Sequence, residues 1–84
     1  MDFSGVGRGR DRWLHEQVAD VIEEAVRSGE LSPGQMLPSE QEIIHQAGVS
    51  RWTVRKAMAL LRERGTTYTR EHLGSFVAAE RKPR

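Results

Sequence analysis

Residues 39–65 read SEQEIIHQAGVSRWTVRKAMALLRERG, and this stretch decides the fold of the chain. Ser39 and Glu42 have the spacing of a capping box, which predicts that a helix begins there. Gly48 is placed to end that short helix, and Ser50 is placed to cap a second one. The second helix ends at Gly65, and its predicted inner face carries Val54, Ala57, Met58 and Leu61. Two helices joined by so short a turn are typical of a helix-turn-helix unit.

The flanking residues extend this unit on both sides. Residues 13–28 carry apolar side chains at the spacing of an amphipathic helix, and Gly29 follows as its expected end. Met36-Leu37 predict a very short strand. Residues 66–69 and 75–77 are β-branched or aromatic and flank a loop at residues 70–74, so they predict a β hairpin. The element order predicts a mainly α fold with a small β hairpin: a winged helix-turn-helix of three helices plus a wing.

The predicted domain organisation has three parts. Residues 1–11 are Gly- and Arg-rich without apolar periodicity, and we expect them to form a disordered basic arm. The basic side chains Arg8, Arg10 and Arg12 have two interpretations: they reach phosphates or a minor groove, or they belong to a simple tail. Residues 12–79 form the winged helix-turn-helix domain, and residues 80–84 form a charged tail.

Size and composition exclude several classes of protein. The 84 residues suffice for one small core and leave little room for a deep substrate cavity. The absence of cysteine excludes disulfides and thiolate zinc sites. No apolar run approaches the length of about 20 residues that a membrane span needs. We therefore expect a cytoplasmic protein with no membrane partner.

The net charge of +1 conceals an uneven distribution of charged side chains. Residues 11–49 hold eight acidic and two basic side chains, whereas residues 50–84 hold nine basic and three acidic ones. A molecule with an acidic half and a basic half has a dipole that orients it toward a polyanion. Charge alone is also compatible with an ordinary solvated surface, and the motifs favour the polyanion.

The start of the second helix in this unit carries the strongest candidate site residues. Arg51 and Arg55 lie four residues apart on one side of the helix. Each planar guanidinium can bond guanine O6 and N7 together or grip a phosphate. The hydroxyls of Ser50 and Thr53 lie at the helix N-terminus, where the partial positive charge favours a phosphate. These side chains predict contacts with DNA.

Further candidates surround this pair of arginines. Trp52 and Lys56 share a neighbouring face of the same helix. Trp52 has two open interpretations: it contacts a thymine methyl or the DNA backbone, or it folds back on the first helix as core. Gln41 is placed to bond a phosphate or an adenine edge, or it is an exposed helix glutamine. The wing adds the candidates Arg70, His72 and Ser75.

The sequence does not favour an enzyme. His15, His45 and His72 are far apart and fall on different predicted elements, so they form a poor metal site. The Gly-rich residues 5–9 do not follow a strand and are weak as a nucleotide-binding motif. We expect no catalytic residue, no cofactor and no metal.

Several short motifs occur in a fixed order along the chain: Leu37-Pro38-Ser39-Glu40, Gly48-Val49-Ser50-Arg51, Thr53-Val54-Arg55 with Ala57, Gly65, and Gly74-Ser75-Phe76-Val77. This ordered set resembles the DNA-binding domain of GntR-type bacterial transcription regulators from about Leu14 to Val77. The resemblance implies a winged-helix repressor domain that binds a palindromic operator. It implies contacts from Ser50, Arg51, Trp52, Thr53 and Arg55, and from the wing around Gly74.

Four departures from the family pattern bear on these contacts. Gln41 stands where many members carry an arginine, and Trp52 replaces a small residue, usually threonine. Thr66-Thr67 replace an apolar pair, so we expect looser packing of the wing. His72-Leu73 replace a glycine and a basic or polar residue at the wing tip.

The leading hypothesis is sequence-specific binding of double-stranded DNA by a GntR-like transcription regulator. It places residues about 50–64 in the major groove and residues about 66–78 near the minor groove. Family members usually continue into a C-terminal domain that binds an effector and forms the dimer. We expect no effector-binding domain in this chain, which leaves a homodimer on DNA or a stand-alone domain. The alternative is a winged-helix module for protein interaction or dimerisation, without specific DNA binding.

Overall fold

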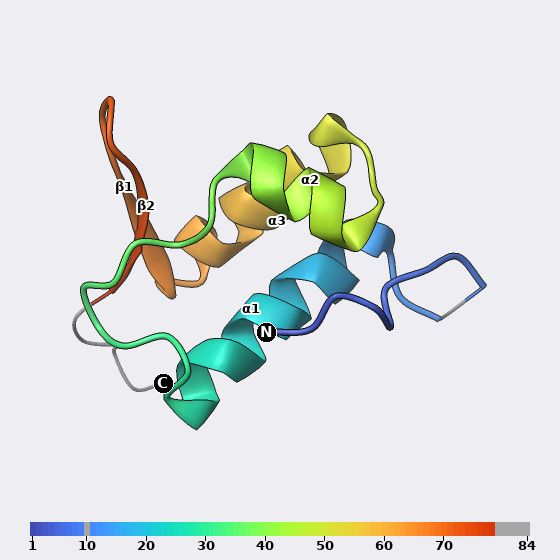
Figure 1. Cartoon of the computed structure of the whole chain (residues 1–84), viewed down its shortest axis with the longest axis horizontal. Coiled ribbons are helices and arrows are strands. Elements are labelled where there is room, and N and C mark those ends of the chain that lie inside the picture. Colours follow the sequence, from blue (N-terminus) through green and yellow to red (C-terminus); the bar gives the residue numbers. More distant parts are fainter. Residues whose placement is uncertain (10, 79–84) are drawn as a thin grey trace.

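Three helices and a two-stranded hairpin make up the computed structural model, which describes residues 1–9 and 11–78 (Figure 1). The elements follow one another as α1 (Leu14–Ser28), α2 (Glu40–Ala47), α3 (Arg51–Glu63), β1 (Thr67–Arg70) and β2 (Gly74–Val77). The winged helix-turn-helix that the sequence predicts is therefore confirmed. The hairpin stands at the C-terminal end of α3, and α2 and α3 lie on the same side of α1.

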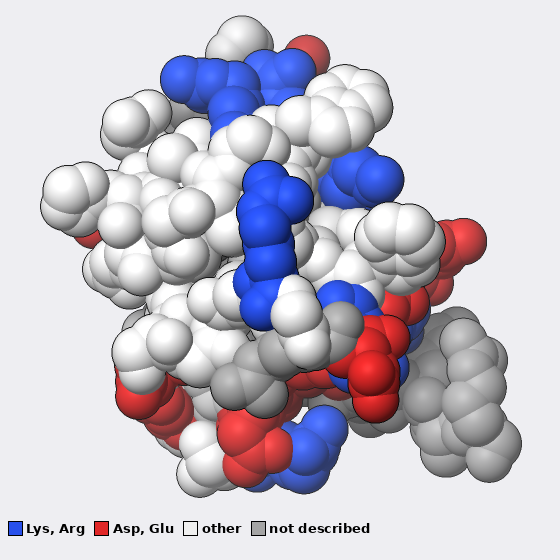
Figure 2. Space-filling view, turned by 90° about the vertical axis from the view of Figure 1, so that its right-hand side faces the viewer, with Lys and Arg blue, Asp and Glu red and all other residues white. Residues whose placement is uncertain are grey.

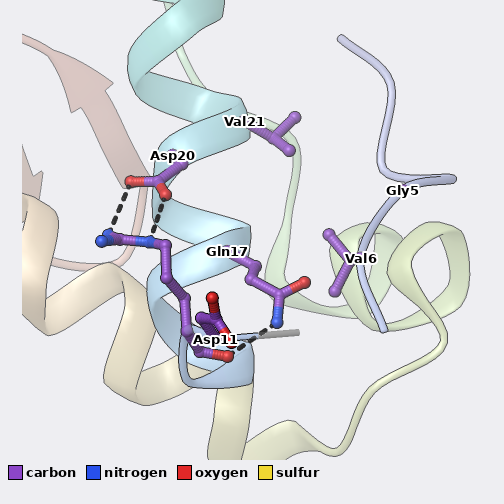
Figure 3. Close-up of a pocket in the computed structure, with 7 residues that line it drawn as sticks. Gly5, Val6, Asp11, Gln17, Asp20 and Val21 are labelled. Carbon is purple, nitrogen blue, oxygen red and sulfur yellow. Dashed lines mark hydrogen bonds and ion pairs between the residues drawn. The ribbon is translucent and has the colours of Figure 1, made fainter. Parts of the chain in front are cut away.

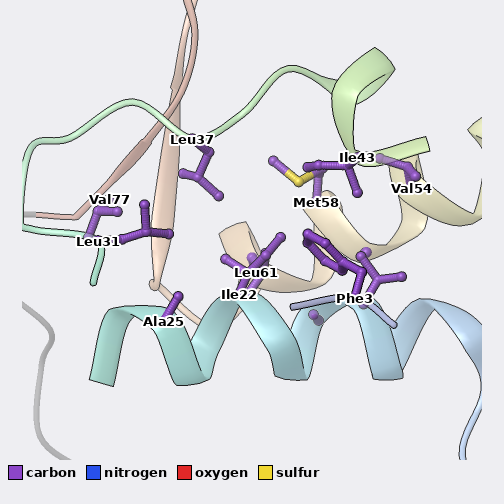
Figure 4. Close-up of a cluster of buried hydrophobic side chains, with 13 residues drawn as sticks. Phe3, Ile22, Ala25, Leu31, Leu37, Ile43, Val54, Met58, Leu61 and Val77 are labelled. Carbon is purple, nitrogen blue, oxygen red and sulfur yellow. The ribbon is translucent and has the colours of Figure 1, made fainter. Parts of the chain in front are cut away.

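The hydrophobic core lies between α1 and the pair formed by α2 and α3 (Figure 4). Ile22 of α1, Ile43 of α2 and Leu61 of α3 have no exposed surface. Burial of one such side chain contributes about 1.5–3 kcal/mol to folding. The base of the hairpin is closed by the buried side chains Leu31, Leu37 and Val77. This core fixes the angle at which α3 presents its opposite face to solvent.

The capping box predicted at the start of α2 is present. The Ser39 hydroxyl accepts a hydrogen bond from the Glu42 amide at 3.1 Å, and the Glu42 carboxylate accepts one from the Ser39 amide at 2.8 Å. The amides at the start of a helix have no acceptor within the helix, so these two bonds satisfy the amides of Ser39 and Glu42. The start of the helix-turn-helix unit is thereby fixed.

Replacing Ser39 with alanine is expected to lower the free energy of unfolding by about 0.5–2 kcal/mol, because the Glu42 amide loses its acceptor. Urea denaturation followed by circular dichroism measures this change. Ser32→Ala is the matched control, since Ser32 is exposed and only its backbone groups form hydrogen bonds with described residues. An equal loss of stability in both variants would rule out the capping role.

The two strands form an antiparallel pair, with Thr67 opposite Val77 and Arg70 opposite Gly74. The segment before α2 runs beside β2: Met36 forms an isolated bridge with Phe76, and the Leu37 amide donates to the Ser75 carbonyl at 2.8 Å. The very short strand predicted at Met36-Leu37 is thus a single bridge. These bonds attach the wing to the connection between α1 and α2.

The two threonines at the base of the wing are buried. Thr66 is 0% exposed and its hydroxyl donates to Glu23 of α1 at 2.5 Å. Thr67 is 4% exposed, and its hydroxyl has no hydrogen-bond partner among the described residues. The Thr66 hydroxyl therefore has a hydrogen-bond acceptor on α1. The Thr67 hydroxyl has lost its hydrogen bonds to water and has gained none with a described residue. A buried unsatisfied hydroxyl of this kind costs about 1–3 kcal/mol.

The two threonines should respond in opposite directions to replacement by valine, which has nearly the same shape. Thr67→Val is expected to raise the free energy of unfolding by about 1 kcal/mol, because it removes an unsatisfied hydroxyl. Thr66→Val is expected to lower it by about 1–3 kcal/mol, because the Glu23 carboxylate loses a buried donor. Denaturation of both variants under one condition measures the difference. Changes of the same sign and size would contradict this assignment of the two hydroxyls.

Residues 1–9 differ from the disordered arm that their composition predicts. Phe3 is only 3% exposed, and Met1 and Val6 pack against the same core. The Gly7 amide donates to the Gln17 side chain of α1 at 3.0 Å. This corrects the expectation of disorder for residues 1–9: a few apolar side chains, Phe3 above all, anchor the segment, and such isolated anchors have no periodicity. Arg10 and the predicted tail at residues 80–84 lie outside the described residues.

Candidate nucleic-acid interface

The turn between α2 and α3 sets the direction in which α3 leaves the core. Gly48 has φ 68° and ψ 35°, a left-handed conformation that glycine adopts easily, and its amide donates to the Ile44 carbonyl at 2.9 Å. Val49 packs half-buried against the core. The Ser50 hydroxyl then accepts from the Thr53 amide at 3.0 Å and caps α3. The predicted turn and cap are both present, and α3 begins at the surface.

The two faces of α3 have opposite character. The predicted inner face, Val54, Ala57, Met58 and Leu61, is buried throughout. The opposite side carries the exposed side chains Arg51, Trp52, Arg55 and Lys56. Trp52 is 68% exposed, so the interpretation of this indole as core is wrong. Phe3 is the aromatic side chain that packs in the core beside α1 and α3 (Figure 4).

The two arginines of the exposed face are available for a ligand. Arg51 forms no ion pair with any described residue. Arg55 contacts Glu40 of α2 through Nε at 3.7 Å, which is too long for a hydrogen bond, and both side chains are substantially exposed. A surface contact of this kind contributes little, about 0–1 kcal/mol. Arg51 therefore has no ion pair among the described residues, and Arg55 has only this exposed contact with the acidic half of the chain.

The remaining predicted site residues divide into two groups. Gln41 is exposed in the first turn of α2, next to Glu40, which contacts Arg55, and therefore joins the arginine group. The wing residues Arg70, His72, Gly74 and Ser75 lie at the other end of α3, where the hairpin stands (Figure 1). Ser75 is half-buried, and the other three are exposed. The sequence-predicted site is thus two patches, one at each end of the helix.

The outer face of the wing is an aromatic layer. Tyr68 and Phe76 pair across the strands with ring centroids 5.7 Å apart, and the Arg70 guanidinium lies 5.9 Å from the Phe76 ring centre. A cation at this distance from an aromatic face is attracted to it. The stacking therefore orients Arg70 at the outer end of the wing. The tip residue His72 has φ 68°, the left-handed region that favours glycine.

Charge is distributed unevenly over the face formed by the N-terminal segment and the α2–α3 turn. Figure 2 shows Lys and Arg side chains prevailing in its upper part, on the side of α2 and α3, and Asp and Glu prevailing lower down, on the side of α1. The acidic and basic halves of the sequence therefore become two regions of the surface. A polyanion is attracted to the α3 side and repelled by the α1 side.

One residue near this face was missed by reasoning from the sequence. Trp13, 73% exposed at the start of α1, lines the same hollow as Trp52, and so does Arg8, which the sequence offered as a possible phosphate contact. The signal that could have found Trp13 is the position of both tryptophans at helix starts, where indoles are seldom needed for the core.

Within residues 1–9 and 11–78, no three or more His, Cys, Asp or Glu side chains gather in a way that could hold a metal ion. Over the same ranges, no helix combines the length and the apolar character that crossing a membrane requires.

Comparison with known proteins assigns the fold to a family. The family model described as bacterial regulatory proteins, gntR family, matches residues 14–77. The chain belongs to the GntR family. Among GntR proteins, the mannosyl-D-glycerate transport/metabolism system repressor MngR of Escherichia coli is 41% identical over 68 residues, which are 81% of this chain and 28% of MngR. This chain spans about a quarter of the length of the curated relatives it matches.

Solved structures show the same winged helix. YtrA from Sulfolobus acidocaldarius, a GntR-family transcription factor, aligns with a TM-score of 0.85 at 30% identity, covering 94% of this chain and 83% of YtrA. AraR(DBD), solved in complex with operator ORX1, aligns with a TM-score of 0.74 at 39% identity, covering 76% of this chain and 77% of AraR(DBD). The fold of this GntR domain is therefore shared with a relative that was solved on its operator.

Proposed function

We propose that this GntR domain binds double-stranded DNA in a sequence-specific manner and regulates transcription. The observation that carries the proposal is the exposure of Arg51 and Arg55 in the first turns of α3, a helix that is attached to the core by a separate, buried face. A helix anchored in this way can enter the major groove with its first turns against the base edges. The likeness to AraR(DBD), solved with its operator, supports the same conclusion.

The proposed contacts follow from the chemistry of each exposed side chain. Arg51 and Arg55 read guanine edges, and each bidentate contact is worth about 1–3 kcal/mol of discrimination. Ser50, Thr53, Lys56 and Gln41 bind phosphates around the start of α3, and Trp52 covers a thymine methyl or a sugar. At the wing, Arg70, His72, Gly74 and Ser75 approach the minor groove. These phosphate contacts position the domain, and the base contacts give it specificity.

The regulatory role is repression from a palindromic operator, bound by two copies of the domain. The similarity to the repressors MngR and NagR supports repression. Two copies are needed because a single winged helix makes few contacts, so its affinity alone is expected to stay near the non-specific range of about 10⁻⁴–10⁻⁶ M. With DNA as its partner, the protein acts in the cytoplasm.

Selection of bound sequences from a pool of random duplexes tests the proposal. We expect a short consensus to be enriched, and we expect the selected duplex to bind more tightly than a scrambled duplex at each of two salt concentrations. The logarithm of the binding constant should fall with the logarithm of salt concentration, with a slope of about −0.9 for each phosphate contact. A pool without enrichment, combined with equal binding of selected and scrambled duplexes, would overturn the proposal.

A further inference from the structure

A hollow lined by cations and indoles lies beside the start of α3, where it adjoins the patch on the exposed face of that helix. Its volume is about 270 Å³, and its lining includes Arg8, Arg12, Trp13, His15, Trp52 and Lys56. The two tryptophans are the only ones in the chain, and they are 73% and 68% exposed. Large exposed indoles are unusual on a surface that has no partner. The core does not explain these positions, which therefore point to a ligand.

The cations of this hollow are available to an anion. Arg8 and Lys56 are exposed, and neither forms an ion pair with a described residue. Arg12 is instead held by Asp20 of α1, with Nε 2.9 Å from one carboxylate oxygen and Nη2 3.2 Å from the other (Figure 3). The available positive charge therefore comes from the N-terminal segment on one side and from α3 on the other.

The loop that carries Arg8 is held in place by one buried amide. Gln17 of α1 is 8% exposed, and its side chain points toward the N-terminal segment (Figure 3). It accepts from the Gly7 amide at 3.0 Å and donates to the Gly7 and Arg12 carbonyls at 3.1 and 2.8 Å. Phe3 anchors the same segment in the core. The backbone next to Arg8 is thus held against α1, so little backbone entropy is lost when Arg8 binds a ligand.

The hollow is continuous with the helix-turn-helix unit. Thr53 and Lys56 of α3 belong to its lining. A second hollow, of about 200 Å³, is lined by Arg8 together with Gly48, Val49 and Ser50 of the α2–α3 turn. Both hollows therefore lie at the edge of the surface that α3 would present to a major groove.

We propose that this hollow binds the sugar–phosphate backbone of the DNA strand that flanks the bases read by α3. Arg8 and Lys56 bond phosphate oxygens, and the indoles of Trp13 and Trp52 cover the apolar faces of deoxyribose. Gln17 is a positioning residue that holds the Arg8 loop. The inference rests on the proposed DNA binding and adds a second contact, which is independent of base sequence. An acidic peptide is the competing occupant.

Two duplexes test the inference: the selected half-site trimmed to the bases that α3 reads, and the same site extended by about half a helical turn on each side. The unmodified protein should bind the extended duplex several-fold more tightly. Its salt slope should be steeper on that duplex by about 0.9 for each added phosphate contact. Arg8→Ala and Trp13→Ala should abolish this gain and leave binding of the trimmed duplex unchanged. Arg27→Ala is the control, because Arg27 is also exposed but lies at the other end of α1, paired with Glu24.

The outcomes separate this inference from the proposed function. If the protein prefers its selected site over a scrambled one but gains nothing from the extension, the inference is overturned and the function stands. If neither duplex is preferred over a scrambled one, the function itself fails. A third outcome is that a polyglutamate peptide binds and that its binding requires Arg8, while the Arg8→Ala variant still binds the extended duplex more tightly than the trimmed one. The hollow is then a protein-binding site and the inference is overturned.

Tryptophan fluorescence gives an independent readout. Trp52→Phe leaves Trp13 as the only tryptophan. Its emission should change when the extended duplex is added and stay constant with the trimmed duplex. Gln17→Leu should reduce the extension gain, although Gln17 does not touch DNA, while thermal unfolding confirms that the domain remains folded. A Trp13 signal that is the same for both duplexes would contradict the proposed position of the flanking strand.

Discussion

Arg51→Ala and Arg55→Ala are each expected to weaken binding of the selected half-site by about 1–3 kcal/mol, which is roughly 5- to 150-fold. The reason is geometric: both guanidinium groups lie on the exposed face of α3, and no described carboxylate holds either of them by a hydrogen bond. Fluorescence anisotropy with labelled duplexes measures the loss. The variants should also discriminate less well against base changes at the position that each arginine reads.

Lys56→Ala is the informative comparison for these arginines. A phosphate contact contributes equally to every sequence, so its loss should weaken selected and scrambled duplexes alike and reduce the salt slope by about 1. Arg27→Ala, in the last turn of α1, should leave both affinities unchanged. Should Arg51→Ala behave as Lys56→Ala does, with specificity intact, Arg51 would be a phosphate contact and the base-reading role would be lost.

Leu61→Ala is expected to lower the free energy of unfolding by about 2–5 kcal/mol, because Leu61 is fully buried and its removal leaves a cavity in the core. Small domains are stable by about 5–15 kcal/mol in total, so this single change removes a large share. Leu61 lies on the face of α3 that packs toward α1, and the same loss should therefore loosen the DNA-facing side.

Leu73→Ala is the matched control for the core variant. Leu73 is 57% exposed at the wing tip, so the same truncation there should change stability by no more than about 0.5 kcal/mol. Thermal and urea denaturation of the two variants measure the contrast. Equal destabilisation by both substitutions would mean that the core is not centred where α1 and α3 meet.

The helix-turn-helix unit could be predicted from the sequence because its signals are local. The capping box of Ser39 and Glu42, the turn at Gly48 and the cap at Ser50 each involve residues no more than four positions apart. Their effects can therefore be derived from spacing alone. The inner stripe of α3 repeats with the helical period and was predicted completely. The site residues on the exposed face follow from the same periodicity, although their contacts with DNA stay a prediction.

The features that the sequence did not predict depend on long-range contacts. Phe3 is buried by residues far along the chain, and the Gly-rich composition around it indicated disorder instead. The hydrogen bond from Thr66 to Glu23 joins residues 43 positions apart. The sequence alone therefore predicted only that Thr66 and Thr67 loosen the packing of the wing. The convergence of Trp13 and Trp52 on one hollow depends on the packing of α1 against α3.

An NMR titration of the ¹⁵N-labelled domain with the selected duplex tests the central claim most directly. If α3 reads the groove, amide shifts should concentrate at residues 50–56 and at the wing tip, and the C-terminal half of α1, residues 22–28, should stay silent. Shifts confined to α1, with residues 50–56 unchanged on addition of DNA, would contradict the account and favour a protein-interaction module.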